Sequence, residues 1–361
     1  MPLSESQVQS ALKSLVDPNT GKDFVSGRAV RNLKLSGDDV ALEIELGYPG
    51  KSQHEPIRRQ VAQALKSVGA ANVSVKVASR VVSHAVQRGV KLVPGIKNII
   101  AVASGKGGVG KSTTAVNLAL ALAAEGASVG VLDADIYGPS QPTMLGIAGR
   151  PESKDGKSLE PMEGHGLQAI SIGFLIDVDT PMVWRGPMVT QALEQLLKDT
   201  RWRELDYLVV DLPPGTGDIQ LTLAQKVPVT GVVIVTTPQD IALIDAKKGL
   251  KMFEKVGIPI LGIVENMSFH VCPKCGHESH IFGAGGAERM AREYGTELLG
   301  QLPLDESIRS QADSGKPTVV SDPDGPLAEI YRKIARRCAV KIAESQRDMT
   351  SKFPNIVVQN T

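Results

Sequence analysis

The sequence predicts an α/β protein in which a mostly parallel sheet is covered by helices on both faces and is preceded by a small α+β domain. From Lys97 onward, short runs of Val, Ile and Leu alternate with helical stretches, and several runs are apolar on both faces, as in parallel sheets. The first of these runs leads directly into a glycine-rich loop and a helix. The length of 361 residues is sufficient for two domains of ordinary size.

The small α+β domain is expected over residues 1–85. Helical spacing of apolar residues predicts its two helices, and strict alternation of apolar and polar residues predicts its two strands. The helices are expected over 4–16 and 57–68, and the strands over 40–46 and 73–77. After residue 79 the pattern gives way to polar residues with Gly89 and Pro94, which predicts a linker that we place at 86–96.

The large domain is expected over residues 97–345, and a polar tail over 346–361. Its strands are short and rich in β-branched residues, whereas the segments between them have helical spacing. The predicted strands are 98–103, 128–132, 168–172, 207–210, 231–236 and 258–264. The predicted helices are 114–124, 187–198, 241–256, 286–294 and 326–343.

A P-loop motif joins the first strand of this domain to its first helix. In the pattern Gly-x4-Gly-Lys-Ser, backbone N–H groups cradle phosphate oxygens, the lysine contacts the outer phosphates and the serine binds Mg²⁺. The helix N-terminus that follows also favours anions. We expect Lys111 and Ser112 to have these roles, with Lys106 as an additional cation beside the phosphates. The complete loop is Gly105, Lys106, Gly107, Gly108, Val109, Gly110, Lys111, Ser112 and Thr113.

Carboxylates follow two of the predicted strands. Asp211 ends the run Leu-Val-Val-Asp and is expected to reach the Mg²⁺ shell, through water, as a Walker B acid. Asp133 and Asp135 end another strand; we expect Asp135 to orient the attacking water and Asp133 to support it. Nucleotide hydrolysis needs such groups because its catalysis is mainly positioning and electrostatic stabilisation. The alternative is that these acids only cap the turns that follow the strands.

Two cysteines, Cys272 and Cys275, are spaced so that both thiols can bind one metal centre. Because histidines lie close by, Cys272, Cys275, His277 and His280 could form a closed zinc site within one chain. An iron–sulfur cluster prefers four thiolates, which two chains of a two-fold dimer could supply. A redox dithiol is less favoured, because thioredoxin-type pairs lie at a strand-to-helix turn. The residues alone leave zinc and cluster open.

Composition and charge exclude several functions. Lys and Arg number 40 against 39 Asp and Glu, so no basic surface for nucleic acid is indicated. No apolar run approaches the roughly 20 residues that span a bilayer, and we expect no membrane association. Three cysteines cannot form a disulfide framework, and Cys338 falls in the apolar stripe of a predicted helix and is expected in the core. We therefore expect a cytoplasmic protein.

Four motifs together resemble a known family. The deviant Walker A sequence Lys-Gly-Gly-Val-Gly-Lys-Ser is similar to that of the MinD, ParA and nitrogenase-iron-protein class of ATPases. The chain is identified more narrowly as resembling the Mrp/ApbC family of iron–sulfur cluster carriers. The motifs that carry this resemblance are Asp133-Ala134-Asp135-Ile136-Tyr137-Gly138-Pro139-Ser140, Trp184-Arg185-Gly186-Pro187, Asp211-Leu212-Pro213-Pro214-Gly215-Thr216-Gly217-Asp218, and the cysteine pair.

The resemblance implies a slow ATPase that binds ATP and magnesium and carries a [4Fe–4S] cluster to apoproteins after receiving it from an upstream donor. It implies a homodimer in which Cys272 and Cys275 of both chains hold one cluster. In this class Lys106 would reach across the interface to the partner's nucleotide, and Asn266 would contact adenine. Residues 1–85 resemble the small domain of iron–sulfur assembly factors, but they contain no cysteine, so we expect no cluster-handling role for them.

Two rival functions remain in view. A positioning ATPase of the MinD or ParA type would bind membrane or DNA, but the tail after Ala343 is mixed in charge and contains Pro354, a poor membrane-binding pattern. The second rival is a zinc-stabilised scaffold with a regulatory nucleotide site. Lipid or DNA binding that depends on ATP would favour the first, and metal analysis would favour the second.

Overall fold

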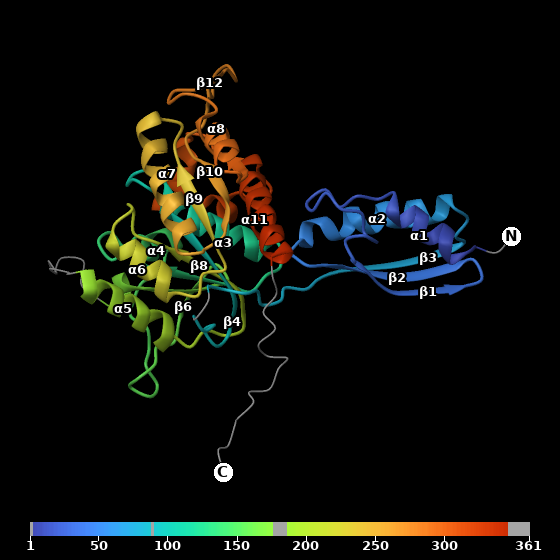
Figure 1. Ribbon diagram of the computed structural model, residues 1–361, viewed down its shortest axis with the longest axis horizontal. Helices are drawn as coiled ribbons and strands as arrows, with labels where there is room; N and C mark the ends of the chain where they lie inside the picture. Colours follow the sequence, from blue (N-terminus) through green and yellow to red (C-terminus); the bar gives the residue numbers. More distant parts are fainter. Residues whose placement is uncertain (1–2, 88–89, 176–185, 346–361) are drawn as a thin grey trace, which may run out of the picture.

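The computed structural model describes residues 3–87, 90–175 and 186–345, which form two lobes (Figure 1). The small domain is a three-stranded sheet in the order β1-β2-β3, in which β1 pairs antiparallel and β3 parallel with β2. Alternate residues of β2 are buried under α1 and α2, as the alternating pattern predicted. Its elements are α1 (Glu5–Lys13), β1 (Val30–Ser36), β2 (Asp39–Leu46), α2 (Lys51–Ser67) and β3 (Asn72–Ser79).

The large domain is built on one eight-stranded sheet in the order β13-β10-β9-β4-β8-β5-β7-β6. Neighbouring strands are parallel except β6, which is antiparallel to β7 at one edge. The central strands are buried on both faces, which is why their sequences are continuously apolar. The strands are β4 (Ile96–Ala103), β5 (Val129–Asp133), β6 (Met162–Gly164), β7 (Leu167–Ser171), β8 (Leu205–Asp211), β9 (Gly231–Thr236), β10 (Ile260–Glu265) and β13 (Leu298–Gln301).

Helices cover both faces of this sheet, because successive side chains of each strand point to opposite faces. Ile100 and Val102 of β4 pack in the core under α3 and α11, whereas Ile99 and Ala101 pack in the core under α5, α6, α7 and α8. The first layer contains α3 (Lys111–Ala124) and α11 (Pro326–Glu344), with the short α4 (Gln141–Leu145), α9 (Glu306–Asp313) and α10 (Thr318–Ser321) beside them. The second contains α5 (Gly186–Asp199), α6 (Asp218–Lys226), α7 (Asp240–Lys255) and α8 (Gly286–Glu293).

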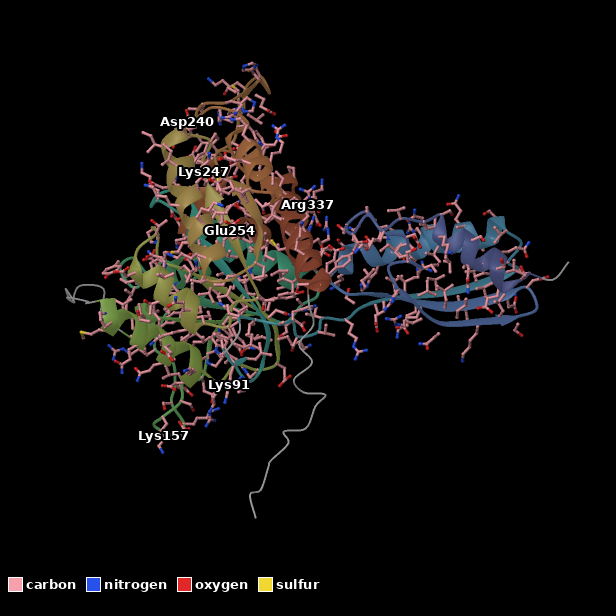
Figure 2. All side chains as sticks on the ribbon, in the orientation of Figure 1. Lys91, Lys157, Asp240, Lys247, Glu254 and Arg337 are labelled. Carbon is pink, nitrogen blue, oxygen red and sulfur yellow. The ribbon has the colours of Figure 1, made fainter. Side chains whose placement is uncertain are left out.

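A small hairpin of β11 (His270–Val271) and β12 (Glu278–Ser279) projects beyond the carboxyl end of β10 (Figure 1). Asp240 and Glu254 mark the two ends of α7 in Figure 2, and Asp240 lies at the end nearer this hairpin. The hairpin and the N-terminal end of α7 therefore lie at the same edge of the molecule. No helix within residues 3–87, 90–175 and 186–345 is long and apolar enough to cross a membrane.

Buried polar contacts join the two lobes. Glu125, the C-cap residue of α3, accepts hydrogen bonds from the backbone N–H and hydroxyl of Ser52 at 3.0 and 2.7 Å. Arg336 of α11 pairs with the same carboxylate and also donates to Ser52 Oγ at 3.2 Å. Glu125 and Arg336 are almost completely buried, at 1% and 4% exposure. The α3 helix, which begins at the P-loop, therefore ends against the small domain.

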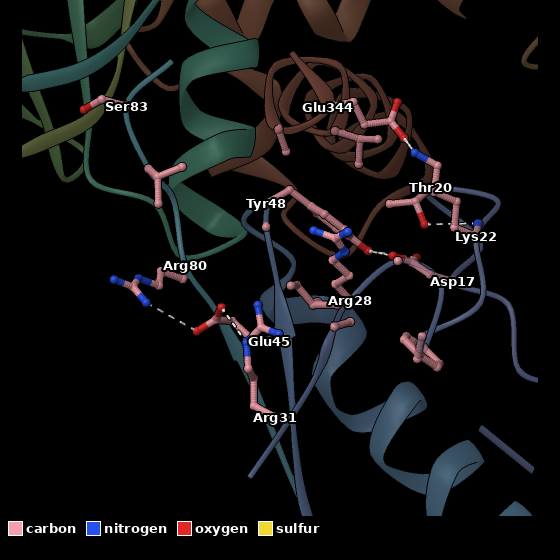
Figure 3. Close-up of a pocket in the computed structure, with 18 of the residues that line it drawn as sticks. Asp17, Thr20, Lys22, Arg28, Arg31, Glu45, Tyr48, Arg80, Ser83 and Glu344 are labelled. Atoms are coloured by element: carbon pink, nitrogen blue, oxygen red, sulfur yellow. Dashed lines mark hydrogen bonds and ion pairs between the residues drawn. The ribbon is translucent and has the colours of Figure 1, made fainter. Parts of the chain in front are cut away.

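A cavity of about 1010 Å³ opens beside this junction, between the small domain and the end of α11 (Figure 3). Its charged side chains largely pair with one another: Glu45 lies 3.4 Å from Arg31 and 3.8 Å from Arg80, and Lys22 lies 2.6 Å from Glu344. The charges on its wall are balanced, so the cavity favours neither an anion nor a cation.

The predicted fold class is confirmed, and most elements of the large domain lie within three residues of their expected ends. The first helix of that domain begins earlier, at Lys111, directly after the P-loop. In the small domain, α2 begins six residues before the expected start, and the edge strand β1 was not predicted. His84, just before the predicted linker and in a stretch expected to be polar, is buried, and its Nδ1 lies 3.0 Å from Asn98 Oδ1 on β4.

Candidate functional site

The P-loop connects β4 to α3, and two of its glycines determine its shape. Gly110, the N-cap residue of α3, has φ +81°, a left-handed conformation that strains any residue with a Cβ. A Cβ at Gly105 would lie 2.2 Å from the carbonyl carbon of Asp245 on α7. Glycine at position 105 is thus required by helix packing, in addition to any contact with phosphate.

Lys111 is the centre of a buried charge cluster. Its side chain is 6% exposed, and its Nζ pairs with Asp211, lies 3.6 Å from Asp135 and donates to Ser112 Oγ at 3.2 Å. The parallel register places Asp133 of β5 directly beside Asp211 of β8. The structure therefore brings the predicted lysine, serine and three acids together at the carboxyl ends of adjacent strands.

The three acids differ in their partners. Asp133 accepts hydrogen bonds from Ser171 Oγ at 3.0 Å and from the backbone N–H groups of Ser140 and Gln141 at 3.0 and 3.1 Å. It therefore holds the start of α4, and its supporting role in hydrolysis stays a prediction. Asp135 is 9% exposed and lies 3.6 Å from Lys111 Nζ, and its role in orienting water stays a prediction.

Burial, together with the smaller effect of the neighbouring Asp211 charge, raises the pKa of Asp133 to about 7. Burial also raises the pKa of Asp135, although the Lys111 ammonium opposes that shift. Both shifts come from crowding acids into a site with little water. A cation that joined this cluster would favour the charged carboxylates.

Gln141 also belongs to this cluster, and the sequence analysis did not identify it. Its Nε2 donates to Asp211 Oδ2 at 2.9 Å and to the backbone carbonyl of Ser112 at 3.2 Å. It therefore connects the Walker B acid to the residue expected to bind Mg²⁺. A glutamine eight residues after a strand has no distinctive pattern, so only the position of the Asp-Ile-Tyr-Gly-Pro-Ser loop could have indicated it.

Asn266 lies against the P-loop. Its Nδ2 donates to the Val109 carbonyl at 2.9 Å, and a Cβ at Gly110 would lie 2.1 Å from the same nitrogen. The structure thus brings Asn266 to the nucleotide loop from the end of β10. Its contact with adenine stays a prediction.

Lys106 has the same charge as Lys111 but differs from it in exposure and in ion-pair partners. It is exposed, and its backbone carbonyl accepts a hydrogen bond from Ser104 Oγ at 2.9 Å. Among the residues that the structure describes, no carboxylate forms an ion pair with it. The second lysine of the loop is therefore available to a group outside this chain.

Cys272 and Cys275 lie in the turn between β11 and β12. The turn is closed by backbone hydrogen bonds from Cys272 N to His277 O at 2.9 Å and from Gly276 N to Cys272 O at 2.8 Å. Cys275 is exposed and Cys272 partly so. Hydrogen bonds from the backbone of Lys274 and Cys275, with a smaller one from the Cys275 side chain, lower the pKa of the Cys272 thiol. The hairpin therefore presents two accessible thiols, one of them stabilised as thiolate.

The closed zinc site considered from sequence is not assembled. His280 Nδ1 lies 3.0 Å from the Ser268 carbonyl, so this nitrogen donates to the backbone. Within the described part of the chain, no group of three or more His, Cys, Asp or Glu side chains is arranged to hold a metal ion. Cys338 is fully buried in α11, as expected for a core residue. One chain therefore offers two ligands to a metal centre.

The predicted motif Trp184-Arg185-Gly186-Pro187 lies only partly within the described residues. Trp184 and Arg185 lie outside the described residues, and Gly186 begins α5. The loop after Asp211 continues to α6, where Gln220 Nε2 donates to the Pro213 carbonyl at 3.4 Å. Gly215 N of this loop donates at 2.9 Å to the carbonyl of Ser104, the residue that precedes the P-loop.

Comparisons with known proteins agree with this geometry. Residues 95–339 match the family described as NUBPL iron-transfer P-loop NTPase, and residues 5–77 match the family described as iron-sulfur cluster assembly protein. The iron-sulfur cluster carrier protein of Escherichia coli (strain K12) is 52% identical over 337 residues, which cover 93% of this chain and 91% of that protein.

Two solved structures are also similar. A nucleotide-binding protein from Archaeoglobus fulgidus in complex with ADP is 39% identical with a TM-score of 0.57, and the match covers 65% of this chain and 91% of that chain. The cell division ATPase MinD of Pyrococcus furiosus shares the fold, with a TM-score of 0.50 at 23% identity over 66% of this chain and 97% of that chain. By sequence, fold and site, this chain belongs to the NUBPL family of iron-transfer P-loop NTPases and carries an N-terminal domain of the iron–sulfur cluster assembly family.

Proposed function

We propose that this protein is an ATPase that binds an iron–sulfur cluster at a homodimer interface and transfers it to apoproteins. The observation that carries the proposal is the accessible pair Cys272 and Cys275, which supplies two thiolates where a cluster prefers four. A two-fold axis that brings the hairpins of two chains together supplies the other two. We infer a [4Fe–4S] cluster held between the subunits, loaded by an upstream donor.

The nucleotide site has the groups that ATP hydrolysis requires. Ser112 and Asp211 offer the hard oxygen ligands that Mg²⁺ prefers, so this donor set fits the ion. Bound Mg²⁺ would neutralise charge on the phosphates. Lys111 would exchange its carboxylate partners for the outer phosphates, and Asp135, buried beside it, would orient the attacking water. Asn266 would contact adenine from the end of β10.

Lys106 supports action between subunits. It is exposed beside the phosphate-binding backbone and has no acidic partner in the described residues, so it can reach the phosphates of a second chain. A cation supplied in trans to a transferring phosphoryl group increases hydrolysis strongly in other nucleotide-hydrolysing proteins. In this proposal the dimer that completes the cluster site also completes the ATPase site.

Exposed apolar side chains support the same interface. Ile241 and Ile244, on the first turns of α7, are 68% and 54% exposed. Val271 and Ile281, on the two arms of the cysteine hairpin, are 45% and 57% exposed, and Tyr137 after β5 is 61% exposed. All five follow carboxyl ends of parallel strands, which meet at one edge of the sheet. Apolar residues gathered on one surface indicate a binding face, and a second copy of the chain is the partner we propose.

The free cysteines also bear on location. Thiols as accessible as Cys275 persist in a reducing compartment. We therefore place the protein in the cytoplasm, where cluster donors and apoproteins are available to it.

Anaerobic reconstitution with iron and sulfide tests this function. The wild-type protein is expected to develop the visible charge-transfer absorption of a cluster, and the double variant Cys272→Ala, Cys275→Ala is expected to lose it. Cys338→Ala is the matched control, because this thiol is buried in α11 and should not affect cluster content. A full cluster in the double variant would refute the assignment.

A further inference from the structure

The segment 265–269 runs from the P-loop to the cysteine hairpin, and its side chains have no part in the functions assigned above except at Asn266. At the P-loop end, Asn266 Nδ2 donates to the Val109 carbonyl at 2.9 Å. The Asn266 N–H donates to the Thr236 carbonyl at 2.8 Å, which holds the residue at the end of β9. Since Asn266 Nδ2 occupies the space of the missing Cβ at Gly110, a change in the loop backbone there must move this side chain.

Buried hydrogen bonds to Glu265 make the segment rigid. Glu265 is fully buried, and its carboxylate accepts hydrogen bonds from Ser268 Oγ at 2.7 Å, Gln301 Nε2 at 3.0 Å and the backbone N–H of Ala287 at 2.7 Å. These donors come from the segment itself, β13 and the start of α8. Met267 lies between them at φ +55°, a conformation that a non-glycine residue rarely adopts. The segment is therefore held in one shape by partners on three sides.

The hairpin end is attached to the same segment. His280 lies in the arm that returns from the hairpin, and its Nδ1 donates to the Ser268 carbonyl at 3.0 Å. The outgoing arm is attached through Leu304, whose N–H donates to the Phe269 carbonyl at 2.7 Å and whose carbonyl accepts from His270 Nδ1 at 3.0 Å. Only one residue, Met267, therefore separates Asn266, which contacts the P-loop, from Ser268, which fixes the returning arm.

We propose that segment 265–269 couples nucleotide binding to the reactivity of Cys272 and Cys275, with His280 as the positioning residue at the hairpin end. The proposal rests on the nucleotide and cluster sites proposed above. Phosphates bind to the backbone of Val109 and Gly110, and this changes the position that Asn266 can occupy. A rigid segment passes the displacement to the Ser268 carbonyl, and His280 passes it to the hairpin. Such coupling requires that ATP interact differently with two arrangements of the segment. The contact that differs between them is the hydrogen bond from Asn266 to the Val109 carbonyl.

The test uses the reduced, cluster-free full chain and Ellman's reagent. Cys338 is buried, so the rate of thiol modification in the native protein reports Cys272 and Cys275. This rate is measured with and without a non-hydrolysable ATP analogue and Mg²⁺. We expect the analogue to change the rate in the wild-type protein, and His280→Ala to reduce that change by about threefold or more. His280→Asn should restore it, because its amide nitrogen can occupy the position of Nδ1.

His277→Ala is the matched control, since His277 is exposed on the same hairpin and its imidazole forms no hydrogen bond with the described residues. It should respond to the analogue as the wild type does. A wild-type response in His280→Ala, or an equal loss in His277→Ala, would overturn the proposal. A wild-type protein that binds the analogue without a change in rate would also overturn it. The shared cluster is judged separately, by the iron and sulfide content of reconstituted protein.

Discussion

The P-loop and the cysteine hairpin leave the same edge of the sheet, but the buried charges of the P-loop are paired within the chain, whereas the thiols of the hairpin have too few ligands beside them. At the P-loop, Lys111 and Asp211 are buried and satisfy each other. At the hairpin, Cys272 and Cys275 are accessible and have no third ligand among the described residues. From this difference we propose that one chain binds the nucleotide, whereas two chains together bind the cluster.

The two lysines of the loop show the same contrast. Lys111 is enclosed by acids of its own chain, whereas Lys106 is exposed, as are Ile241 and Ile244 at the start of α7. Gly105 brings α7 so close to the loop that both features belong to one surface. A second subunit on this surface would meet the free lysine and the apolar side chains together.

The largest expected effect separates these two lysines. Lys111→Ala should abolish ATP hydrolysis and also destabilise the fold by about 3 kcal/mol, because it leaves the buried Asp211 carboxylate without a compensating cation. Lys106→Ala should reduce hydrolysis at least about tenfold but change the free energy of unfolding by less than about 0.5 kcal/mol, as an exposed residue. Urea unfolding and steady-state hydrolysis measure both quantities. Equal stability of the two variants would contradict the contrast.

Mixing the two variants sharpens the result. A hybrid dimer of Lys106→Ala and Lys111→Ala chains contains one intact P-loop that faces an intact Lys106 of the other chain. The mixture should therefore recover about a quarter of wild-type hydrolysis, since half of the dimers are hybrids with one working site each. Activity no higher than that of the separate variants would place Lys106 in its own chain's site.

A smaller effect is expected on the apolar surface. Ile241→Asp should weaken dimer formation about tenfold, because it places a charge in the proposed interface. Val16→Asp is the matched control: Val16 is 49% exposed but lies in the small domain, away from this edge. Sedimentation of both variants with a non-hydrolysable ATP analogue gives the dissociation constants. Similar values for Ile241→Asp and the wild type would exclude this face.

Much of the fold could be predicted because its strands are buried on both faces and its helices have one apolar face. The strand β1 was missed because a bulge between Arg31 and Lys34, with Asn32 at φ +52°, breaks the alternation of its apolar residues. The start of α2 was placed late because Pro56 lies inside the helix. Pro56 is the sixth residue of the helix, where proline removes one backbone hydrogen bond, so the sequence favours a start after it.

The candidate site was predicted where a motif fixes the backbone. Lys111, Ser112, Asp135 and Asp211 lie together because each follows the carboxyl end of a parallel strand. The contacts of Gln141 could not be predicted, because they depend on how α4 packs across the sheet edge. The zinc alternative was open in sequence for a similar reason: spacing places histidines near cysteines but does not say which way their rings point.

The central claim is that two chains share one cluster. Native mass spectrometry of the anaerobically reconstituted protein tests it most directly, because chain number and metal content are read from one mass. The account predicts a species of two chains with a single [4Fe–4S] cluster, and a cluster-free mass for any single chain. A single chain that carries a cluster or a zinc ion, or a dimer with one metal centre in each chain, would contradict it.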